Sequence, residues 1–418
     1  MAIHRRTFVL SGLTAAAMSR IAGANDRLRL GIVGPGRQGR GLLRQFYEHC
    51  GEQNAEIAAV CDLWTEHRTQ AAGIVKEKSG QDPVAIQHYE DLLARKDIDG
   101  VIIATPDHQH ARQLMMGVRA GKDVFCEKPM ANVLNEAKAA FRLVSGSKQV
   151  VQMGTQGLSS GKYQAARKFV ETGKLGLISR VDHAGSFNGP RWRPVDAVKR
   201  IRAEDTDWKA WLMGHRMRPF DPHLYFEFRL YREFSNGIPD QWLTHSVAGI
   251  QHIMDDYFPE SVVASGGVLV YKDGRENSDT FHATFTYPKG FIFDYSAMFG
   301  NDYPGHLRFY GQNGTIDRDG GENEGYVVRG IGGGKRPERL AKDVSLPPIN
   351  PVNHMRNWVE CVRSRQTPNA DIKSGYAHSV ASIMAAQAER TGRRQYWDAR
   401  REIITARPPR PARVRQTG

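Results

Sequence analysis

Three glycines in one short turn carry the clearest chemical signal in the sequence. Gly34, Gly36 and Gly39 form the pattern Gly-x-Gly-x-x-Gly, between a short apolar run and a helix-like run. A turn of this kind at the start of a helix lets backbone N–H groups approach a pyrophosphate. We therefore expect a dinucleotide to bind at this turn, which also contains Arg37 and Gln38.

An acidic residue after the next apolar run indicates which dinucleotide is bound. Asp62 lies 23 residues beyond the last glycine of the turn. Its carboxylate would accept hydrogen bonds from the ribose hydroxyls of adenosine and would repel a 2′-phosphate. The sequence therefore predicts NAD and makes NADP less favourable. The alternative role for Asp62 is to cap the helix that follows it.

Lys128 is the candidate acid–base group, in the run Cys126-Glu-Lys-Pro129. Oxidation of an alcohol by NAD requires hydride transfer and removal of the hydroxyl proton. A lysine that is partly desolvated and lies beside the cationic nicotinamide has a lowered pKa, so it can act as a general base. The alternative is an ordinary surface lysine at the end of a strand.

The elements around these residues alternate between strand and helix over 27–155. The expected strands are at 28–33, 56–62, 85–89, 100–104, 123–126 and 149–153. The expected helices are at 42–50, 66–78, 108–120 and 131–144. Such alternation predicts βαβ units and a doubly wound parallel sheet, which is a Rossmann domain.

The pattern changes after this domain, and strands separated by short turns predict a mostly antiparallel sheet over 156–395. The expected strands are at 179–187, 261–271, 280–287, 290–297, 306–310, 315–317 and 324–328. One helix at 241–254 interrupts them, and two late helices at 351–364 and 373–391 could pack back on the Rossmann domain. The expected fold class is α/β plus α+β, and 396–418 is expected to be a basic, proline-rich tail.

Several motifs together resemble the Gfo/Idh/MocA oxidoreductases. They are Gly34–Gly39, Ala104-Thr-Pro-Asp-His-Gln-His110, Cys126-Glu-Lys-Pro129, Asp207-Trp-x-x-Trp-Leu212 and Gly311-Gln-Asn-Gly-Thr315. The resemblance covers about residues 28–395. It implies a Rossmann domain and a second domain whose large, mostly antiparallel sheet often forms an oligomer interface, so a homodimer or homotetramer is expected.

The resemblance also implies roles for single residues. Lys128 would face the reacting hydroxyl, and His245 would be the catalytic histidine. The residues implied at the nicotinamide half of the cofactor are Thr105, Pro106, His108, Glu127 and Gln156.

One position departs from the family pattern. Many members have an aspartate four residues before the histidine, where this sequence has Gln241. Asp240, Tyr225 and Tyr231 are the candidates for the second proton-handling group.

Aromatic and basic residues suggest a sugar, polyol or glycoside as the small-molecule substrate. Arg191 and Arg193 could bind hydroxyls or a carboxylate, and several aromatic side chains could stack on a pyranose. These aromatic residues are Trp192, Trp208, Trp211, Tyr225 and Trp242. The alternatives are core packing for the aromatic residues and solvated charge for the arginines. His108 and His110 lack a zinc-ligand spacing, so no metal is predicted.

The N-terminus predicts export. Arg5-Arg6-x-Phe8, an apolar run and Ala22-Gly-Ala24 resemble a twin-arginine signal cleaved after residue 24. The apolar run of about 11 residues is too short to span a membrane, so no stable insertion is expected after cleavage. A periplasmic or secreted location is therefore expected.

Composition limits the other function classes. The net charge is +13, and seven arginines near the two ends leave +6 for the body. No basic face is evident, so nucleic-acid binding is not expected. The four cysteines form no C-x-x-C pair. Cys61 and Cys126 end expected strands and suit small core residues, although a disulfide stays open.

Three functions follow from these features. The first is an NAD-dependent oxidoreductase of sugar hydroxyls with a tightly bound cofactor that is recycled in place. The second is a redox-neutral glycoside hydrolase or lyase that oxidises, eliminates and reduces again. The third is a non-catalytic dinucleotide-binding protein, against which the pair Glu127 and Lys128 argues.

Overall fold

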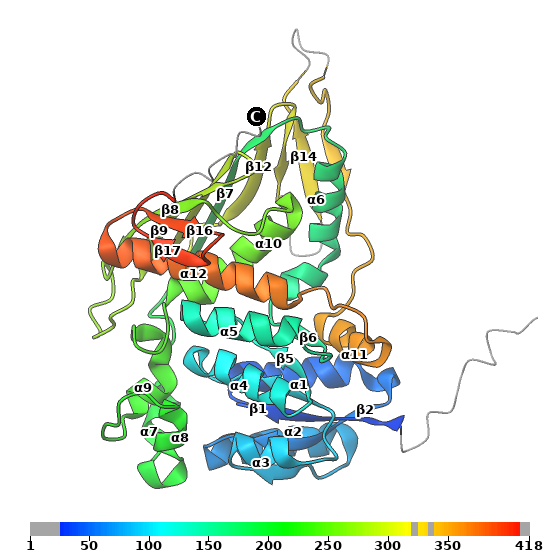
Figure 1. Cartoon of the computed structure of the whole chain (residues 1–418), viewed down its shortest axis with the longest axis vertical. Coiled ribbons are helices and arrows are strands. Elements are labelled where there is room, and N and C mark those ends of the chain that lie inside the picture. The colour runs from blue at the N-terminus through cyan, green and yellow to red at the C-terminus, as the bar shows by residue number, and fades with distance from the viewer. Residues whose placement is uncertain (1–25, 319–324, 333–337, 410–418) are drawn as a thin grey trace, which may run out of the picture.

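The computed structural model describes residues 26–318, 325–332 and 338–409 (Figure 1). The expected signal segment at 1–24 lies outside the described residues, and so does the end of the chain from 410. The described part of the chain has two sheets stacked along its long axis, with the Rossmann domain at one end and the second domain at the other.

The first sheet has six strands, all parallel, in the order β3-β2-β1-β4-β5-β6. The strands are β1 (Leu28–Val33), β2 (Ala55–Cys61), β3 (Val84–Ile86), β4 (Gly100–Ile103), β5 (Asp123–Cys126) and β6 (Val151–Met153). The helices are α1 (Arg37–His49), α2 (Thr65–Ser79), α3 (Tyr89–Ala94), α4 (Asp107–Arg119) and α5 (Leu134–Ser145). The strand order reverses between β1 and β4. The turn after β1 and the loops after β4 and β5 therefore meet at one edge, where such sheets bind ligands.

Successive side chains of these strands point to opposite faces of the sheet and are apolar on both, so helices cover both faces. Leu30 and Ile32 pack in one apolar cluster with Phe46 of α1 and Trp358 of the late helix α11 (His354–Ser364). Side chains of the opposite parity, such as Val101, join the larger cluster on the other face. The prediction that a late helix packs back on the Rossmann domain is thus confirmed for α11.

The second sheet has eleven strands and is mostly antiparallel, with one parallel pair between β7 and β10. Its strands are β7 (Ile178–Asn188), β8 (Ser261–Gly267), β9 (Thr280–Tyr287), β10 (Phe291–Met298), β11 (Gly300–Asn301), β12 (His306–Gly311), β13 (Gly314–Asp317), β14 (Tyr326–Gly330), β15 (Val344–Leu346), β16 (Gln395–Asp398) and β17 (Ile403–Thr405). Helices α6 (Gly161–Glu171), α10 (Thr244–Met254) and α12 (Ile372–Thr391) lie against one face (Figure 1). The fold class predicted from the sequence is confirmed.

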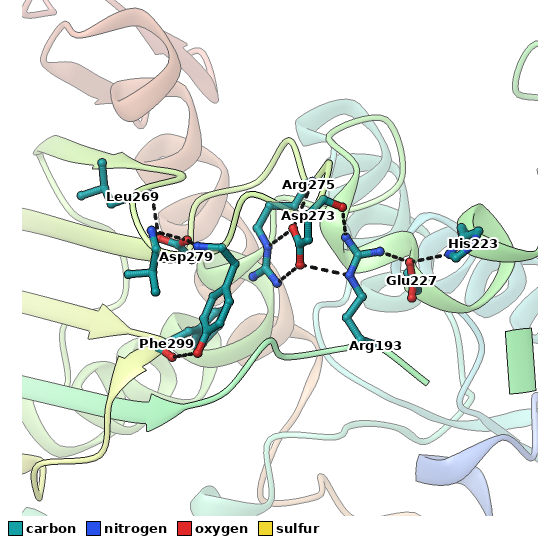
Figure 2. A network of polar contacts seen from close by, with 10 residues as sticks. Arg193, His223, Glu227, Leu269, Asp273, Arg275, Asp279 and Phe299 are labelled. Carbon is teal, nitrogen blue, oxygen red and sulfur yellow. Dashed lines mark hydrogen bonds and ion pairs between the residues drawn. The ribbon is translucent and has the colours of Figure 1, made fainter. Parts of the chain in front are cut away.

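Two boundaries were wrong. The expected tail from residue 396 instead begins with β16 and β17, which extend the second sheet beyond β8. The expected strand at 261–271 ends at Gly267. The carboxylate of buried Asp279 accepts the backbone N–H groups of Leu269, Val270 and Tyr271, so these residues leave the sheet (Figure 2).

A segment that the sequence patterns did not anticipate follows β7. It consists of short helical turns: α7 (Val195–Arg200), η5 (Ala203–Asp205), α8 (Trp208–Leu212), α9 (Pro222–Glu227) and η6 (Phe228–Leu230). We call residues 190–235 the flanking segment, because its helices lie alongside the Rossmann domain rather than on the second sheet (Figure 1). A π-helical turn, η7 (Pro239–Leu243), then leads into α10.

Among the described residues no helix is long and apolar enough to cross a membrane. All four cysteines are buried and unbridged, which confirms the core interpretation of Cys61 and Cys126.

Candidate active site

The glycine turn after β1 has the geometry that a pyrophosphate site needs. Gly34 has a positive φ of 71°, and a Cβ there would lie 2.7 Å from the Thr105 methyl. A Cβ on Gly39 would lie 2.7 Å from the Gly34 carbonyl oxygen. The fold itself requires these two glycines. A Cβ on Gly36 would come no closer than 3.4 Å to the His67 ring, so the protein alone could accommodate one.

The start of α1 fits a bound anion. Gly36 is the N-cap, no side chain caps the helix, and its first turn contains no acidic residue. The first-turn N–H groups of a helix have no intrahelical partner, and they carry the positive end of the helix dipole. The turn therefore fits the pyrophosphate of NAD, and the glycine at position 36 leaves room for its approach.

Asp62 is buried at the end of β2 and does not cap α2, whose N-cap is Trp64. Its Oδ1 accepts the backbone N–H of Trp64 at 2.8 Å, and its Oδ2 lies 3.0 Å from Nδ1 of His67. These contacts hold the turn into α2. A carboxylate has about four acceptor positions, so hydrogen bonds to ribose hydroxyls remain possible. The sequence analysis missed His67, which lies between Asp62 and the glycine turn.

Glu127 joins three separate segments at the end of β5. Its Oε1 accepts hydrogen bonds from Gln38 at 2.7 Å and from Gln156 at 3.0 Å. A Cβ on Gly154 would lie 2.6 Å from the Glu127 carboxylate, so only glycine fits there. The structure therefore brings together Gln38, Glu127 and Gln156, which the sequence assigned to the cofactor independently of one another.

Lys128 points to the second domain. Its Nζ donates to the backbone oxygen of Gln241 at 2.8 Å and to Oε1 of the same residue at 3.3 Å. Burial lowers the pKa of Lys128, nearby Asp107, Glu127 and Asp240 oppose that shift, and Arg229 adds to it. The direction agrees with the expectation, and burial within the protein is enough to produce it.

A hydrogen-bonded chain continues from Lys128 through Gln241. The Gln241 Oε1 also accepts from Arg229 Nε at 2.8 Å, and its Nε2 donates to Asp107 Oδ2 at 2.5 Å. Ser235 donates to the same Asp107 oxygen at 2.6 Å. The sequence analysis missed Asp107 and Arg229. Asp107 lies inside the motif at 104–110, where the histidines drew attention, whereas no local signal marks Arg229.

His245 lies in the first turn of α10. The residue is exposed by its accessible surface, although many protein atoms surround its ring. Burial lowers the pKa of His245 to about 3, with further contributions from Lys128, His378 and His354. The ring is therefore neutral, and Lys128 is one of its charged neighbours.

Comparisons with known proteins agree with this geometry. Residues 28–155 match the model of the oxidoreductase family with an NAD-binding Rossmann fold, GFO_IDH_MocA. The Rossmann domain of this chain is thus similar to that family. Its description as NAD-binding confirms the cofactor predicted from the sequence.

Among curated proteins, an inositol 2-dehydrogenase of Rhizobium meliloti is 27% identical over 194 residues, which are 45% of this chain and 55% of that protein. The chain thus matches about half the length of this relative. Two solved structures cover 88% of this chain with TM-scores of 0.67. They are a levoglucosan dehydrogenase with NADH and levoglucosan (15% identical, 98% of that chain) and an aldose-aldose oxidoreductase from Caulobacter crescentus with glycerol (19%, 99%). At these identities the likeness shows a common fold.

Against the Gfo/Idh/MocA pattern, the structure decides between Gln241 and Asp240. Asp240 is fully buried and accepts hydrogen bonds from the backbone N–H and the side chain of Asn236, at 2.7 and 3.2 Å. Burial and the Asp107 charge raise the pKa of Asp240 to about 7. The turn η7 thus directs Gln241 to Lys128, whereas the carboxylate of Asp240 is bonded to Asn236 in the interior.

Tyr225 and His108 also lie away from the reacting centre. Tyr225 is buried and stacks on Trp211. Burial raises the pKa of Tyr225 well above its usual value, and the charge of Asp62 adds to the rise. His108 is buried among Trp211, Phe234 and His215, and its Nε2 lies 3.0 Å from the Trp211 carbonyl. Both were predicted site residues, and the apolar core of the flanking segment holds them instead. Thr105 and Pro106, from the same loop, remain beside the glycine turn and at the N-cap of α4.

The proposed sugar-stacking residues divide into two groups. Trp208 and Trp211 are buried and stack on each other, so the core-packing alternative holds for them. Trp192 and Trp242 are half-buried. Each makes an edge-to-face contact with Phe299, with ring centroids 5.2 and 4.9 Å apart. These two remain candidates for a sugar site.

The two arginines of this region also differ. Arg193 is held by Glu227 and Asp273, and Asp273 in turn pairs with Arg275 (Figure 2). It therefore has a structural role. Arg191 lies over the rings of Phe187 and Trp242, at 4.1 and 5.6 Å, with no carboxylate partner among the described residues.

Proposed function

We propose that the protein is an NAD-dependent oxidoreductase that acts on a hydroxyl group of a sugar, polyol or glycoside, with Lys128 as the acid–base group. The observation that supports this most directly is the pair of hydrogen bonds from Lys128 Nζ to Gln241, at the end of the same sheet that carries the glycine turn. When bound at this turn, NAD supplies the hydride acceptor.

The contacts of Lys128 suit a base. A neutral amine has two N–H bonds and one lone pair. The two Gln241 oxygens can accept both N–H bonds, which leaves the lone pair for the hydroxyl proton of a substrate. Burial favours the neutral amine, so proton transfer near neutral pH becomes accessible.

His245 supports this assignment by its own charge state. With a pKa of about 3, its ring stays neutral over the physiological range and is a poor proton acceptor. It can still donate or accept a hydrogen bond. We therefore assign it to the orientation of the hydroxyl rather than to removal of the proton.

Retention of NAD is part of the proposal, because the flanking segment is tied to the Rossmann domain at several points. Arg200 forms an ion pair with Glu66 of α2 at 2.9 Å. Phe226 contacts the ring of Trp64, and the Trp211 carbonyl accepts from Gln109 of α4 at 2.6 Å. These contacts lie around Asp62 and along α4, so release of a bound dinucleotide would require some of them to break.

The first test is mass spectrometry of the ligand released from denatured, purified protein, followed by single-turnover reduction of the bound cofactor with a panel of sugars, polyols and glycosides. We expect NAD in the released fraction and reduced nicotinamide with at least one compound. Retained NAD that no compound reduces would count against an oxidoreductase. Net hydrolysis without reduced cofactor at the end would favour the redox-neutral alternative.

We also propose export by the twin-arginine route and a homo-oligomeric assembly. Replacement of Arg5 and Arg6 together by lysine should block export, and normal export of this variant would contradict the proposal. Light scattering of the mature protein should give the mass of a dimer or tetramer.

A further inference from the structure

We propose that the substrate carries an anionic group, a carboxylate or a phosphate ester, which Arg229 and Arg191 bind beside Lys128. The inference rests on the proposed function and names its substrate class. Neutral sugars and polyols would then be weaker substrates than their acidic counterparts.

The first support is that three basic side chains lie against two consecutive residues, Gln241 and Trp242. Lys128 Nζ and Arg229 Nε both donate to Gln241, at 3.3 and 2.8 Å from its Oε1. The guanidinium carbon of Arg191 lies 5.6 Å from the ring of Trp242. The three basic side chains come from the end of β5, from η6 and from the loop after β7, and tertiary structure alone brings them together.

The second support is the lack of a neutralising partner. Among the described residues, none of these three side chains forms an ion pair with a carboxylate, whereas nearby Arg193 has two such partners. The Nε of Arg191 is buried and has no hydrogen-bond partner. A buried N–H of a guanidinium without an acceptor is costly, so a ligand acceptor is expected there.

The nearby acids do not fill this role. Asp107 already accepts from Ser235 and Gln241, and Glu127 accepts from Gln38, Gln156 and the Lys128 backbone. Asp240 is turned towards Asn236. Among the described residues, these acids accept no hydrogen bond from the side chains of Lys128, Arg229 and Arg191.

The position of Arg229 favours the substrate over the cofactor as the source of the anion. The pyrophosphate of NAD belongs at the glycine turn and the start of α1, where Arg37 stands. Arg229 instead shares the Gln241 oxygen with Lys128, the group that takes the hydroxyl proton. A planar guanidinium presents a fork of donors that matches a carboxylate or phosphate.

The test uses NAD-loaded protein and matched compounds. Hexuronates and hexose 6-phosphates of the gluco, galacto and manno series are compared with their parent hexoses, both in single-turnover reduction of bound NAD and in calorimetric binding. The variants are Arg229→Gln, Arg229→Lys and Arg191→Gln. The control is Arg216→Gln, an exposed arginine of the same flanking segment.

We expect at least one acidic compound to react and bind better than its neutral parent. Arg229→Gln should reduce that acid-to-neutral ratio by about 10- to 100-fold, the effect of one hydrogen bond to a charged group. Arg229→Lys should keep part of the preference, Arg191→Gln should lower it, and Arg216→Gln should not change it. A preference for hexuronates identifies a carboxylate, and a preference for hexose 6-phosphates identifies a phosphate.

Two results would overturn the inference. One is equal use of acidic and neutral compounds by the unaltered protein. The other is an unchanged acid-to-neutral ratio in both glutamine variants with a weaker affinity for NAD, which would assign the cations to the cofactor. If no compound reduces NAD but acidic sugars bind and Arg229→Gln abolishes that binding, the anion subsite stands and the proposed oxidoreductase activity fails.

Discussion

The two ends of the cofactor site are built in different ways. At the adenosine end, Asp62, His67 and the glycine turn all come from the first 40 residues of the Rossmann domain and meet through local β–α connections. At the catalytic end, Lys128 depends on Gln241, Arg229 and Asp107, which are brought together across more than 100 residues of sequence. The first end is therefore set by one supersecondary unit, and the second by the docking of two domains.

The difference has a consequence for function. The adenosine end depends on local backbone geometry, so it can stay the same while residues of the second domain near Lys128 change. Cofactor binding and substrate choice can therefore vary separately. In this protein the second domain places Gln241 next to Lys128, at a position where many members of the resembled family have an aspartate. Substitutions at the two ends should therefore affect different measurements.

The largest expected effect is on proton transfer. Lys128→Ala should lower single-turnover reduction of bound NAD by about 10²- to 10⁴-fold, the usual contribution of a positioned acid–base group. NAD affinity should change little, because the glycine turn lies in another part of the site. Lys128→Arg should not restore the rate, since a guanidinium keeps its proton. Lys96→Ala, at an exposed lysine, is the control. A wild-type rate in Lys128→Arg would assign the proton to another group.

The next effect is a shift of the pH profile by Gln241→Glu. A carboxylate in place of the amide, 3.3 Å from Lys128 Nζ, would favour the ammonium and so raise the lysine pKa. With the neutral amine as the proposed active form, the rate should fall near pH 7 and recover at higher pH. Single-turnover rates measured across pH give the midpoint. An unchanged midpoint would mean that Lys128 does not control the profile.

Substitutions at two glycines of the turn should affect different quantities, one the stability of the fold and the other the affinity for NAD. Gly34→Ala places a Cβ in a left-handed conformation against Thr105, so unfolding free energy should fall by about 1–2 kcal/mol or more. Gly36→Ala should stay within about 0.5 kcal/mol of the parent. It should nevertheless weaken NAD binding by roughly tenfold, or 1.4 kcal/mol. Chemical denaturation and NAD titration test both. Equal losses of stability would remove the argument that Gly36 serves the ligand.

The smallest effect is expected at Asp62. Asp62→Asn keeps an oxygen that can accept the Trp64 N–H, so the turn into α2 should survive. The loss of the charge should narrow the preference for NAD over NADP by about 1 kcal/mol. Paired titrations with the two dinucleotides measure this ratio. If the ratio did not move, the contacts of Asp62 with Trp64 and His67 would be its whole role.

Several parts of this molecule were predictable because their signals are local. The strands of the Rossmann domain, the helix at 373–391 and the paired strands at 280–287 and 290–297 were predicted within a few residues of their observed bounds. The Rossmann helices were also predicted, except α3. Gly34 and Gly39 stand in the turn that the sequence pattern predicted. Each of these features depends on periodicity or on a turn whose neighbours in space are also neighbours in sequence.

The flanking segment is a region whose structure could not be predicted from local sequence signals. Its tryptophans and tyrosine have the composition of a sugar site, but Trp208, Trp211 and Tyr225 form a small core of their own. Aromatic composition is the same in both cases, and only the contacts distinguish them. Likewise, Arg191 and Arg193 differ by two positions, yet one is neutralised by carboxylates and the other is not.

The sequence by itself determined the parallel sheet, the dinucleotide turn, the choice of NAD and Lys128 as the candidate base. Tertiary structure alone decided that Gln241, and not Asp240, meets Lys128, and that Arg229 stands beside them. The physical reason is the π-helical turn η7, in which the burial of Asp240 against Asn236 fixes the direction of its neighbour. Adjacent residues of a helical turn point in different directions, so which one enters a site depends on how that turn packs against the rest of the protein.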